Sequence, residues 1–233
     1  MNNKSIKLTL LSILLVFSIN AFSQDSDQRT YKFGVNLGAN LFELNQNDLF
    51  EQYNGRLNYS LGFSFEYDID SSLSLLSGIN FDKKSTVWEF MVSSTSNGGF
   101  GSFTVEDKIR FSYINVPVYL RYHIGNSKNI GLNLGGYYNH TLNVENEAKI
   151  VESESLIHEV GDEFTTQPAE DIISNDDFGM LIGLSYQFAI NDKNHFSLEL
   201  RNEFGLANIS QITAFNEVKT NTLKLILNWQ LPI

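Results

Sequence analysis

Residues 116–140, VPVYLRYHIGNSKNIGLNLGGYYNH, contain two runs of alternating apolar and polar residues on either side of a short polar turn. A period of two is typical of a β-strand whose two faces have different surroundings. One face of the pair carries Val116, Val118, Leu120, Tyr122, Ile130, Leu132, Leu134 and Tyr138. The opposite face carries Tyr119, Arg121, Asn133 and Gly135. The fold depends on whether the apolar face meets a second layer of protein or lipid.

The same alternation recurs along the chain and predicts eight strands. Besides the quoted pair, the alternating runs span residues 31–42, 56–69, 73–81, 178–190, 196–206 and 223–233. Strands of globular proteins usually have about five or six residues, whereas a tilted strand needs about nine to eleven to cross a bilayer. Most of these runs reach the second length. Strand length therefore indicates that the apolar faces of the strands meet lipid.

The links between the predicted strands alternate between short and long. The short links lie at residues 70–72, 123–129 and 191–194, and the long links at 43–56, 82–108, 143–177 and 207–219. An up-and-down barrel of the outer membrane has this asymmetry, with tight periplasmic turns and longer outer loops. A soluble sandwich has no physical reason to sort its loops in this way.

The polar faces of the strands are rich in glycine, serine and asparagine, which suit a narrow interior. Eight strands leave room only for side chains inside a barrel, and charges buried there must pair. We therefore predict a polar network of Glu66, Arg121, Glu199 and Arg201 in the lumen, without assigning the pairs. The predicted fold is all-β, an eight-stranded antiparallel up-and-down transmembrane β-barrel with a side-chain-filled lumen. A soluble β-sandwich is the alternative.

One local conflict in the alternation lies just before the quoted stretch. Ile109, Phe111 and Tyr113 occupy odd positions, whereas the apolar positions from 114 to 122 are even. Pro117, which cannot donate a ladder hydrogen bond, lies inside the same strand. A β-bulge at residues 113–115 would explain the switch.

The N-terminal residues differ from the rest of the chain. A basic start, the apolar run LTLLSILLVF at residues 8–17 and small residues after it predict a secretory signal peptide over residues 1–23. Cleavage near Ser23/Gln24 would leave residues 24–233 as the outer-membrane β-barrel domain. A short membrane anchor is the alternative for this segment. The predicted location is the outer membrane of a diderm bacterium.

Composition excludes several classes of function. The net charge of −11 disfavours nucleic acid as a partner, because a phosphate-binding surface needs a basic patch. Without cysteine the chain has no disulfide and no thiolate ligand. The four histidines, His123, His140, His158 and His195, have no metal-ligand spacing, and the sequence has no HExxH, GxSxG or phosphate-loop pattern. We predict no catalytic residue, no metal ligand and no cofactor.

The segment from 143 to 177 is strongly acidic, with Lys149 as its only basic residue. The simplest interpretation is a solvated loop. The alternative is an interaction surface for a protein partner or for Ca²⁺, for which carboxylates are suitable hard ligands, although the spacing of an EF-hand loop is missing. The residues assigned to this acidic interaction loop are Glu145, Glu147, Glu152, Glu154, Glu159, Asp162 and Glu163.

Three stretches of the sequence carry a resemblance to a known family. They are YINVPVYLRY at 113–122, SGINF at 77–81 and RNEFGL at 201–206, followed by the alternating C-terminal strand. With them the chain resembles the PorT-like outer-membrane β-barrel proteins of Bacteroidota over nearly all of its predicted mature length. It departs from the family at Asn115, where an acidic residue is common, and at Ile233, where an aromatic residue is usual. The resemblance implies an outer-membrane location and no single biochemical role.

Together these observations predict an integral outer-membrane β-barrel protein that has a structural or interaction role through its long extracellular loops. We expect no open pore, because wide channels need about sixteen strands. The first alternative is a barrel enzyme active at the outer rim through His140 or His158. The second is a secreted soluble β-barrel that binds a small apolar ligand.

Overall fold

The computed structural model describes the chain from Thr30 to Ile233 apart from several connecting segments. The described residues are 30–45, 54–96, 99–125, 127–154, 159–163, 173–191, 193–211 and 218–233. Their strands are β1 (Tyr31–Asn45), β2 (Asn54–Gly55), β3 (Leu57–Asp68), β4 (Leu73–Ser96), β5 (Gly99–Ile124), β6 (Ile130–Ser153), β7 (Asp176–Asn191), β8 (Asn194–Gly205) and β9 (Lys219–Pro232). No helix within these ranges is long and apolar enough to cross a membrane. The predicted signal peptide at 1–23 lies outside them.

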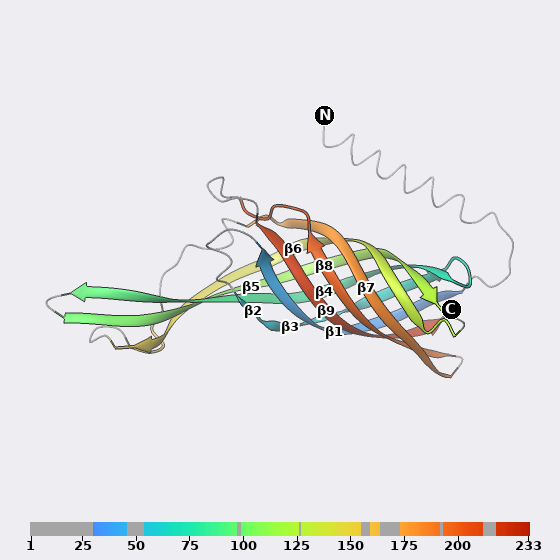
Figure 1. The fold of residues 1–233 in the computed structure, drawn as a ribbon, viewed down its shortest axis with the longest axis horizontal. Coiled ribbons are helices and arrows are strands. Elements are labelled where there is room, and N and C mark those ends of the chain that lie inside the picture. Colours follow the sequence, from blue (N-terminus) through green and yellow to red (C-terminus); the bar gives the residue numbers. More distant parts are fainter. Residues whose placement is uncertain are drawn as a thin grey trace, which may run out of the picture.

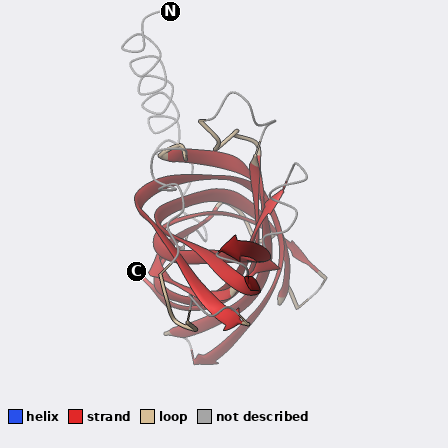
Figure 2. Ribbon diagram, turned by 90° about the vertical axis from the view of Figure 1, so that its left-hand side faces the viewer, coloured by secondary structure: helices blue, strands red, loops and turns tan. Residues whose placement is uncertain are grey.

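Eight of these strands close into a ring through antiparallel pairing. β1 pairs with β3 on one side and with β9 on the other. From β9 the ring continues through β8, β7, β6, β5 and β4 and returns to β3. The two-residue β2 pairs with β4 and is not a member of the ring. Figure 2 shows the strands curving around a common axis. The prediction of an all-β, eight-stranded, antiparallel up-and-down barrel is confirmed.

The alternation in the sequence separates the outside of the barrel from its inside. On β6, Leu134 is 58% exposed, whereas the adjacent Asn133 is only 1% exposed. Large apolar side chains are exposed in the same way on the other strands, among them Val35, Leu37, Phe63, Leu120, Ile182, Leu200 and Leu227. The apolar face of the quoted stretch therefore covers the outside of the barrel and does not meet a second layer of protein.

Aromatic side chains form part of a belt on the outside, close to the short turns. Tyr31 stacks on Tyr67 with ring centroids 5.0 Å apart. Phe196 lies between Phe188 and Trp229, at centroid distances of 5.6 and 6.5 Å. Such belts are typical of the interface between membrane and water.

The short and long links lie at opposite ends of the barrel, but the long links are shorter than the sequence predicted. β4 continues to Ser96 and β5 starts at Gly99, so most of the predicted loop at 82–108 is a β-hairpin. β6 likewise extends to Ser153, into the predicted loop at 143–177. β4, β5 and β6 have 24, 26 and 24 residues, and Figure 1 shows them continuing well beyond the barrel. We call residues 83–96, 99–112 and 143–153 the outer sheet.

The predicted bulge exists, but its position and its cause differ from the prediction. The alternation of β5 is unbroken, and Ile109, Phe111 and Tyr113 are buried on the same side as Asn115. The register of the β5–β6 pair shifts between Ser112 and Tyr113, and the extra residue is in β6, where positions 142 and 143 are both exposed. The sequence suggested that the apolar residues of β5 change from one face of the strand to the other near residue 114, and this is wrong. Ile109, Phe111 and Tyr113 face the interior, which becomes apolar near the long-loop end.

Two glycines of the interior leave room for tyrosine side chains. A Cβ atom on Gly135 would lie 2.5 Å from the Cα and Cβ atoms of Tyr119 on β5. A Cβ atom on Gly179 would lie 2.8 Å from the ring of Tyr137 and would overlap the carbonyl oxygen of Phe204. Both tyrosines are buried and lie inside the barrel. A narrow barrel thus accommodates large side chains by placing glycine opposite them.

Candidate functional site: barrel interior, short-turn cavity and outer sheet

A cluster of two carboxylates and two guanidinium groups crosses the interior near the short-turn end. Arg121 on β5 holds Glu66 of β3 at 3.0 Å and Glu199 of β8 at 3.4 Å. Arg201 contacts the other oxygen of Glu199 at 2.7 Å. All four side chains are buried. The structure thus brings together the four residues assigned to the lumen network, and we call them the Arg121 cluster.

A second charged cluster, not assigned from the sequence, lies farther toward the long-loop end. The Lys224 ammonium on β9 contacts Asp82 of β4 at 2.5 Å and Glu203 of β8 at 2.8 Å. Lys84 lies 3.7 Å from Glu203 and 4.0 Å from Asp82. We call these four buried residues the Lys84 cluster. Like the Arg121 cluster, it pairs two positive with two negative side chains, which is what burial of charge requires.

Apolar and aromatic side chains pack beside and over the two charged clusters, which meet where Arg201 lies 3.9 Å from Glu203. Leu76, Tyr119, Tyr137 and Leu181 pack together in the interior. The Arg201 guanidinium lies 4.5 Å from the centroid of the Tyr119 ring, close enough for a cation–π interaction. At the long-loop end an apolar cap consists of Phe42, Leu44, Ile109, Phe111, Tyr113, Val144, Ile173, Ile209 and Val218. Side chains therefore occupy the described interior at each of these levels.

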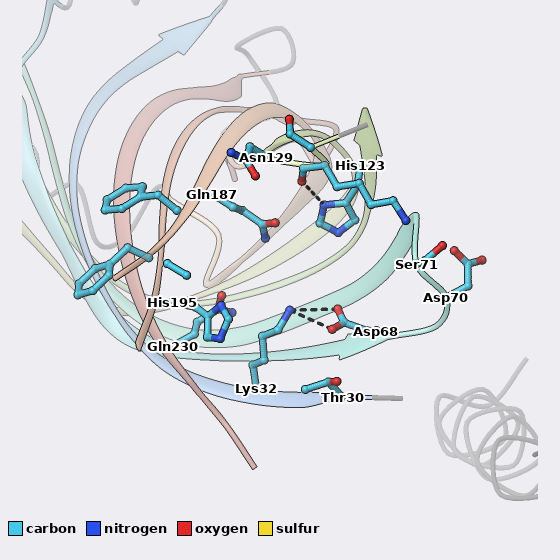
Figure 3. A pocket seen from close by; sticks show the side chains of 15 residues that line it. Thr30, Lys32, Asp68, Asp70, Ser71, His123, Asn129, Gln187, His195 and Gln230 are labelled. Atoms are coloured by element: carbon cyan, nitrogen blue, oxygen red, sulfur yellow. Dashed lines mark hydrogen bonds and ion pairs between the residues drawn. The ribbon is translucent and has the colours of Figure 1, made fainter. Parts of the chain in front are cut away.

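A cavity of about 470 Å³ lies below the Arg121 cluster, at the short-turn end. Its lining comes from strand ends and short turns: Thr30, Lys32, Asp68, Asp70, Ser71, His123, Ser127, Lys128, Asn129, Gln187, Phe188, Ala189, His195, Phe196 and Gln230. Figure 3 shows Lys32 reaching toward Asp68 inside it. Gln230 donates a hydrogen bond to Glu66 at 3.0 Å and so connects the cavity to the Arg121 cluster.

The outer sheet has ordered charge pairs and a small apolar core. Glu147 on β6 accepts hydrogen bonds from Lys149 and from Arg110 of β5, and these bonds lower its pKa to about 2. Because the pKa of Glu147 is lowered, its ion pairs stabilise the folded state fully at pH values above the ordinary pKa of a glutamate. This stabilisation is lost as the pH falls through about 2. In the same sheet, Phe103, Val105, Ala148 and Ile150 form a buried cluster. The outer sheet is therefore an ordered surface.

The residues of the acidic interaction loop do not gather at one point. Three of them, Glu145, Glu147 and Glu152, belong to β6. Of the others, Asp162 accepts a hydrogen bond from the backbone of Glu159 at 2.9 Å. Glu154 and Glu163 are also described, the latter in an isolated bridge to Lys149. Within the described ranges no three of these carboxylates lie close enough to share a metal ion.

The residues considered for a rim enzyme are on the outside of the barrel or beyond the described ranges. The His140 Nδ1 atom lies 3.0 Å from Asp176, and both side chains are exposed. The Tyr138 hydroxyl donates to the same carboxylate at 2.5 Å. His158 lies outside the described residues. His140 therefore faces outward and does not line the cavity at the short-turn end.

The apolar exterior, the charged interior and the alternating links define an integral β-barrel of the outer membrane. The family described as "Outer membrane protein beta-barrel domain" matches residues 22–211, and the chain belongs to this family. None of the curated proteins matches the sequence. The outer-membrane location predicted from the sequence is thereby confirmed, and the short turns are assigned to the periplasmic side.

Several solved structures are similar to this chain. Neisserial surface protein A is 12% identical, with a TM-score of 0.41, covering 84% of this chain and 95% of that one. OprG from Pseudomonas aeruginosa is 9% identical, with a TM-score of 0.41, covering 88% and 96%. AlkL, solved in DMPC bilayers, is 10% identical, with a TM-score of 0.43, covering 91% and 93%. Likenesses of this degree carry no information about ligands or partners.

Proposed function

We propose that this outer-membrane barrel has a structural or interaction role: it anchors the outer sheet at the cell surface, where the sheet contacts another macromolecule. One observation carries the proposal. β4, β5 and β6 have 24 to 26 residues, whereas a strand needs about nine to eleven to cross a bilayer. About half of each strand therefore continues beyond the length that a bilayer requires, as paired sheet.

Charge and exposure suit this surface for contact with a basic partner. The acidic side chains of β6 project from the outer sheet, and Met91 on β4 is 71% exposed. Arg56, which directly precedes β3, lies 3.8 Å from Glu89 of the outer sheet, and both side chains are exposed. An acidic surface attracts a basic partner through complementary charge, and an exposed apolar side chain offers area to bury on contact.

The interaction role predicts specific cross-links in intact cells. A photo-cross-linking amino acid at Met91 should give a discrete protein adduct, because this side chain is exposed on the outer sheet. The same amino acid at Ile182, which is 52% exposed on the lipid-facing side, is the matched control and should give none. Adducts from both positions, or from neither, would contradict the proposed role.

The filled interior supports the absence of an open pore. We expect the purified barrel to give no discrete conductance steps in planar lipid bilayers, because the two charged clusters and the apolar cap occupy the lumen. A large porin reconstituted in the same way is the positive control. Reproducible unit steps from the barrel itself would overturn this part of the proposal.

Membership of the PorT-like group of Bacteroidota is a finer proposal than the family match. It is supported by YINVPVYLRY at 113–122, which places Tyr119 and Arg121 in the interior.

A non-enzymatic role is supported by the outward position of His140. Replacing His140 should leave any surface activity of the cells unchanged.

A further inference from the structure

We propose that the periplasmic end of the barrel contains a binding site for a divalent transition metal such as Zn²⁺, with Glu66, Asp68 and His123 as its protein ligands. Asp68 and His123 line the cavity shown in Figure 3, and the buried Glu66 contacts Lys32 of the same lining. It is remote from the outer sheet, so it does not depend on the proposed interaction role.

Three atoms of the ligand type converge at this point. One oxygen each from Glu66 and Asp68 and one ring nitrogen of His123 lie within 4.8 Å of one another. Within the described ranges, no other group of three metal-ligating side chains comes this close. Ligands of one Zn²⁺ ion lie about 2.0–2.2 Å from it, so a small side-chain movement brings all three onto a common ion. A set with one nitrogen favours a transition metal over Ca²⁺ or Mg²⁺, which prefer oxygen alone.

The orientation of His123 is the second observation that points to a metal. Its Nδ1 atom lies 3.3 Å from the carbonyl oxygen of Lys128. A carbonyl can only accept, so Nδ1 carries a hydrogen and Nε2 is the ring nitrogen left for a metal ion. Nε2 lies 2.9 Å from the Ser74 hydroxyl, which donates its one hydrogen to Asp68 at 2.7 Å. Nε2 therefore donates to Ser74 in this arrangement, and a bound metal ion would take the place of that hydrogen. Metal-binding histidines commonly have such a backbone partner on the second nitrogen.

The turn before β6 provides that carbonyl through an unusual backbone. Lys128 has a φ of 53°, and Gly125 has a φ of 76°. The Lys128 amide donates to the carbonyl of Gly125 at 3.3 Å, which closes the turn. Residues other than glycine rarely adopt positive φ. The turn thus holds in place the group that orients the imidazole.

In the structure, the ammonium group of Lys32 occupies the position between the carboxylates where the metal ion would bind. Its ammonium lies 3.0 Å from Glu66 and 2.9 Å from Asp68, between the two carboxylates. A position that stabilises one positive charge also stabilises another, and a bound metal ion would displace this ammonium. The side chain of Lys32 lines the cavity and has room there to move aside. Metal and lysine therefore compete for the same carboxylates.

The test is calorimetric titration of Zn²⁺ into the purified, folded full-length barrel in detergent. His123→Ala and Asp68→Asn should each weaken binding at least about tenfold, because each removes a ligand. Lys32→Met should tighten binding about tenfold or more, because it removes the competing positive charge. A purely structural role of Lys32 does not predict tighter binding.

Controls separate this site from nonspecific binding. His195→Ala changes another histidine that lines the cavity and should leave the affinity unchanged. Heat-modifiable gel migration checks that each variant is folded, and the visible absorption of bound Co²⁺ reports nitrogen ligation in wild type and its loss in His123→Ala. The proposal is overturned if wild type binds no Zn²⁺, if His123→Ala and Asp68→Asn bind as wild type does, or if Lys32→Met does not bind more tightly.

Discussion

Replacing Arg121 by alanine is expected to lower the free energy of unfolding by about 3–5 kcal/mol. The side chain is fully buried and pairs with Glu66 and Glu199 at once. Its removal leaves two buried carboxylates with one positive partner fewer in the Arg121 cluster. Urea unfolding of the barrel in lipid vesicles, followed by the fluorescence of Trp88 and Trp229, measures the change.

Arg56→Ala is the matched control for this prediction. Arg56 also pairs with two carboxylates, at 3.8 and 4.0 Å, but its side chain is 51% exposed. Exposed pairs contribute at most about 1 kcal/mol, so this variant should unfold almost as wild type does. In the double variant Arg121→Met with Glu66→Gln, part of the lost stability should return. An equal, small effect of Arg56→Ala and Arg121→Ala would show that the charges inside are well hydrated.

Replacing Leu134 by arginine is expected to destabilise the barrel by about 2–4 kcal/mol in lipid. Leu134 faces outward near the middle of the part of β6 that spans the membrane, between Leu120 of β5 and Ile182 of β7. A guanidinium there lies in hydrocarbon and can reach neither water nor a carboxylate partner. The same vesicle unfolding experiment measures the loss.

Two control variants isolate the effect of depth in the bilayer. Leu231→Arg places the same charge outside the barrel near the end of β9, where the cost should fall to about 0–1 kcal/mol. Leu134→Ala separates the loss of the apolar side chain from the gain of charge. If the two arginine variants lost equal stability, the outward face of β6 would not lie at the centre of a bilayer.

The strands that span the membrane were predictable because lipid imposes a simple rule. Outside positions must be apolar and inside positions must fit a narrow polar lumen, so the alternation of Leu132, Asn133 and Leu134 is plain in the sequence. The rule ends at the membrane surface. In the outer sheet both faces can carry polar side chains, and the run from Lys83 to Ser96 has too little contrast between its faces for a strand to be recognised.

The charged residues of the interior were only partly predictable for a related reason. The strand pattern places Arg121 and Glu66 on inward faces, but they are 55 positions apart in the sequence, and only the register of the sheet shows that they meet. Asp82 and Lys84 were assigned to a loop, which hid the Lys84 cluster. The Lys32 contacts are likewise a consequence of register, since Lys32 lies opposite Glu66 in the β1–β3 pair.

The outer sheet also affects how easily the strands of the barrel find one another. Ser96 of β4 pairs with Gly99 of β5, which is three positions away in the sequence, so the pairing of these strands needs only local loop closure. The seam between β1 and β9 joins strands that are far apart in the sequence, so its loop closure costs the most conformational entropy. Pairing within the hairpin satisfies the backbone groups along the shared edge only, and the outer edges of β4 and β5 need β3 and β6 before they can lie in a bilayer. The part of the protein that ends farthest outside the cell is thus the part that can pair with the least loop closure.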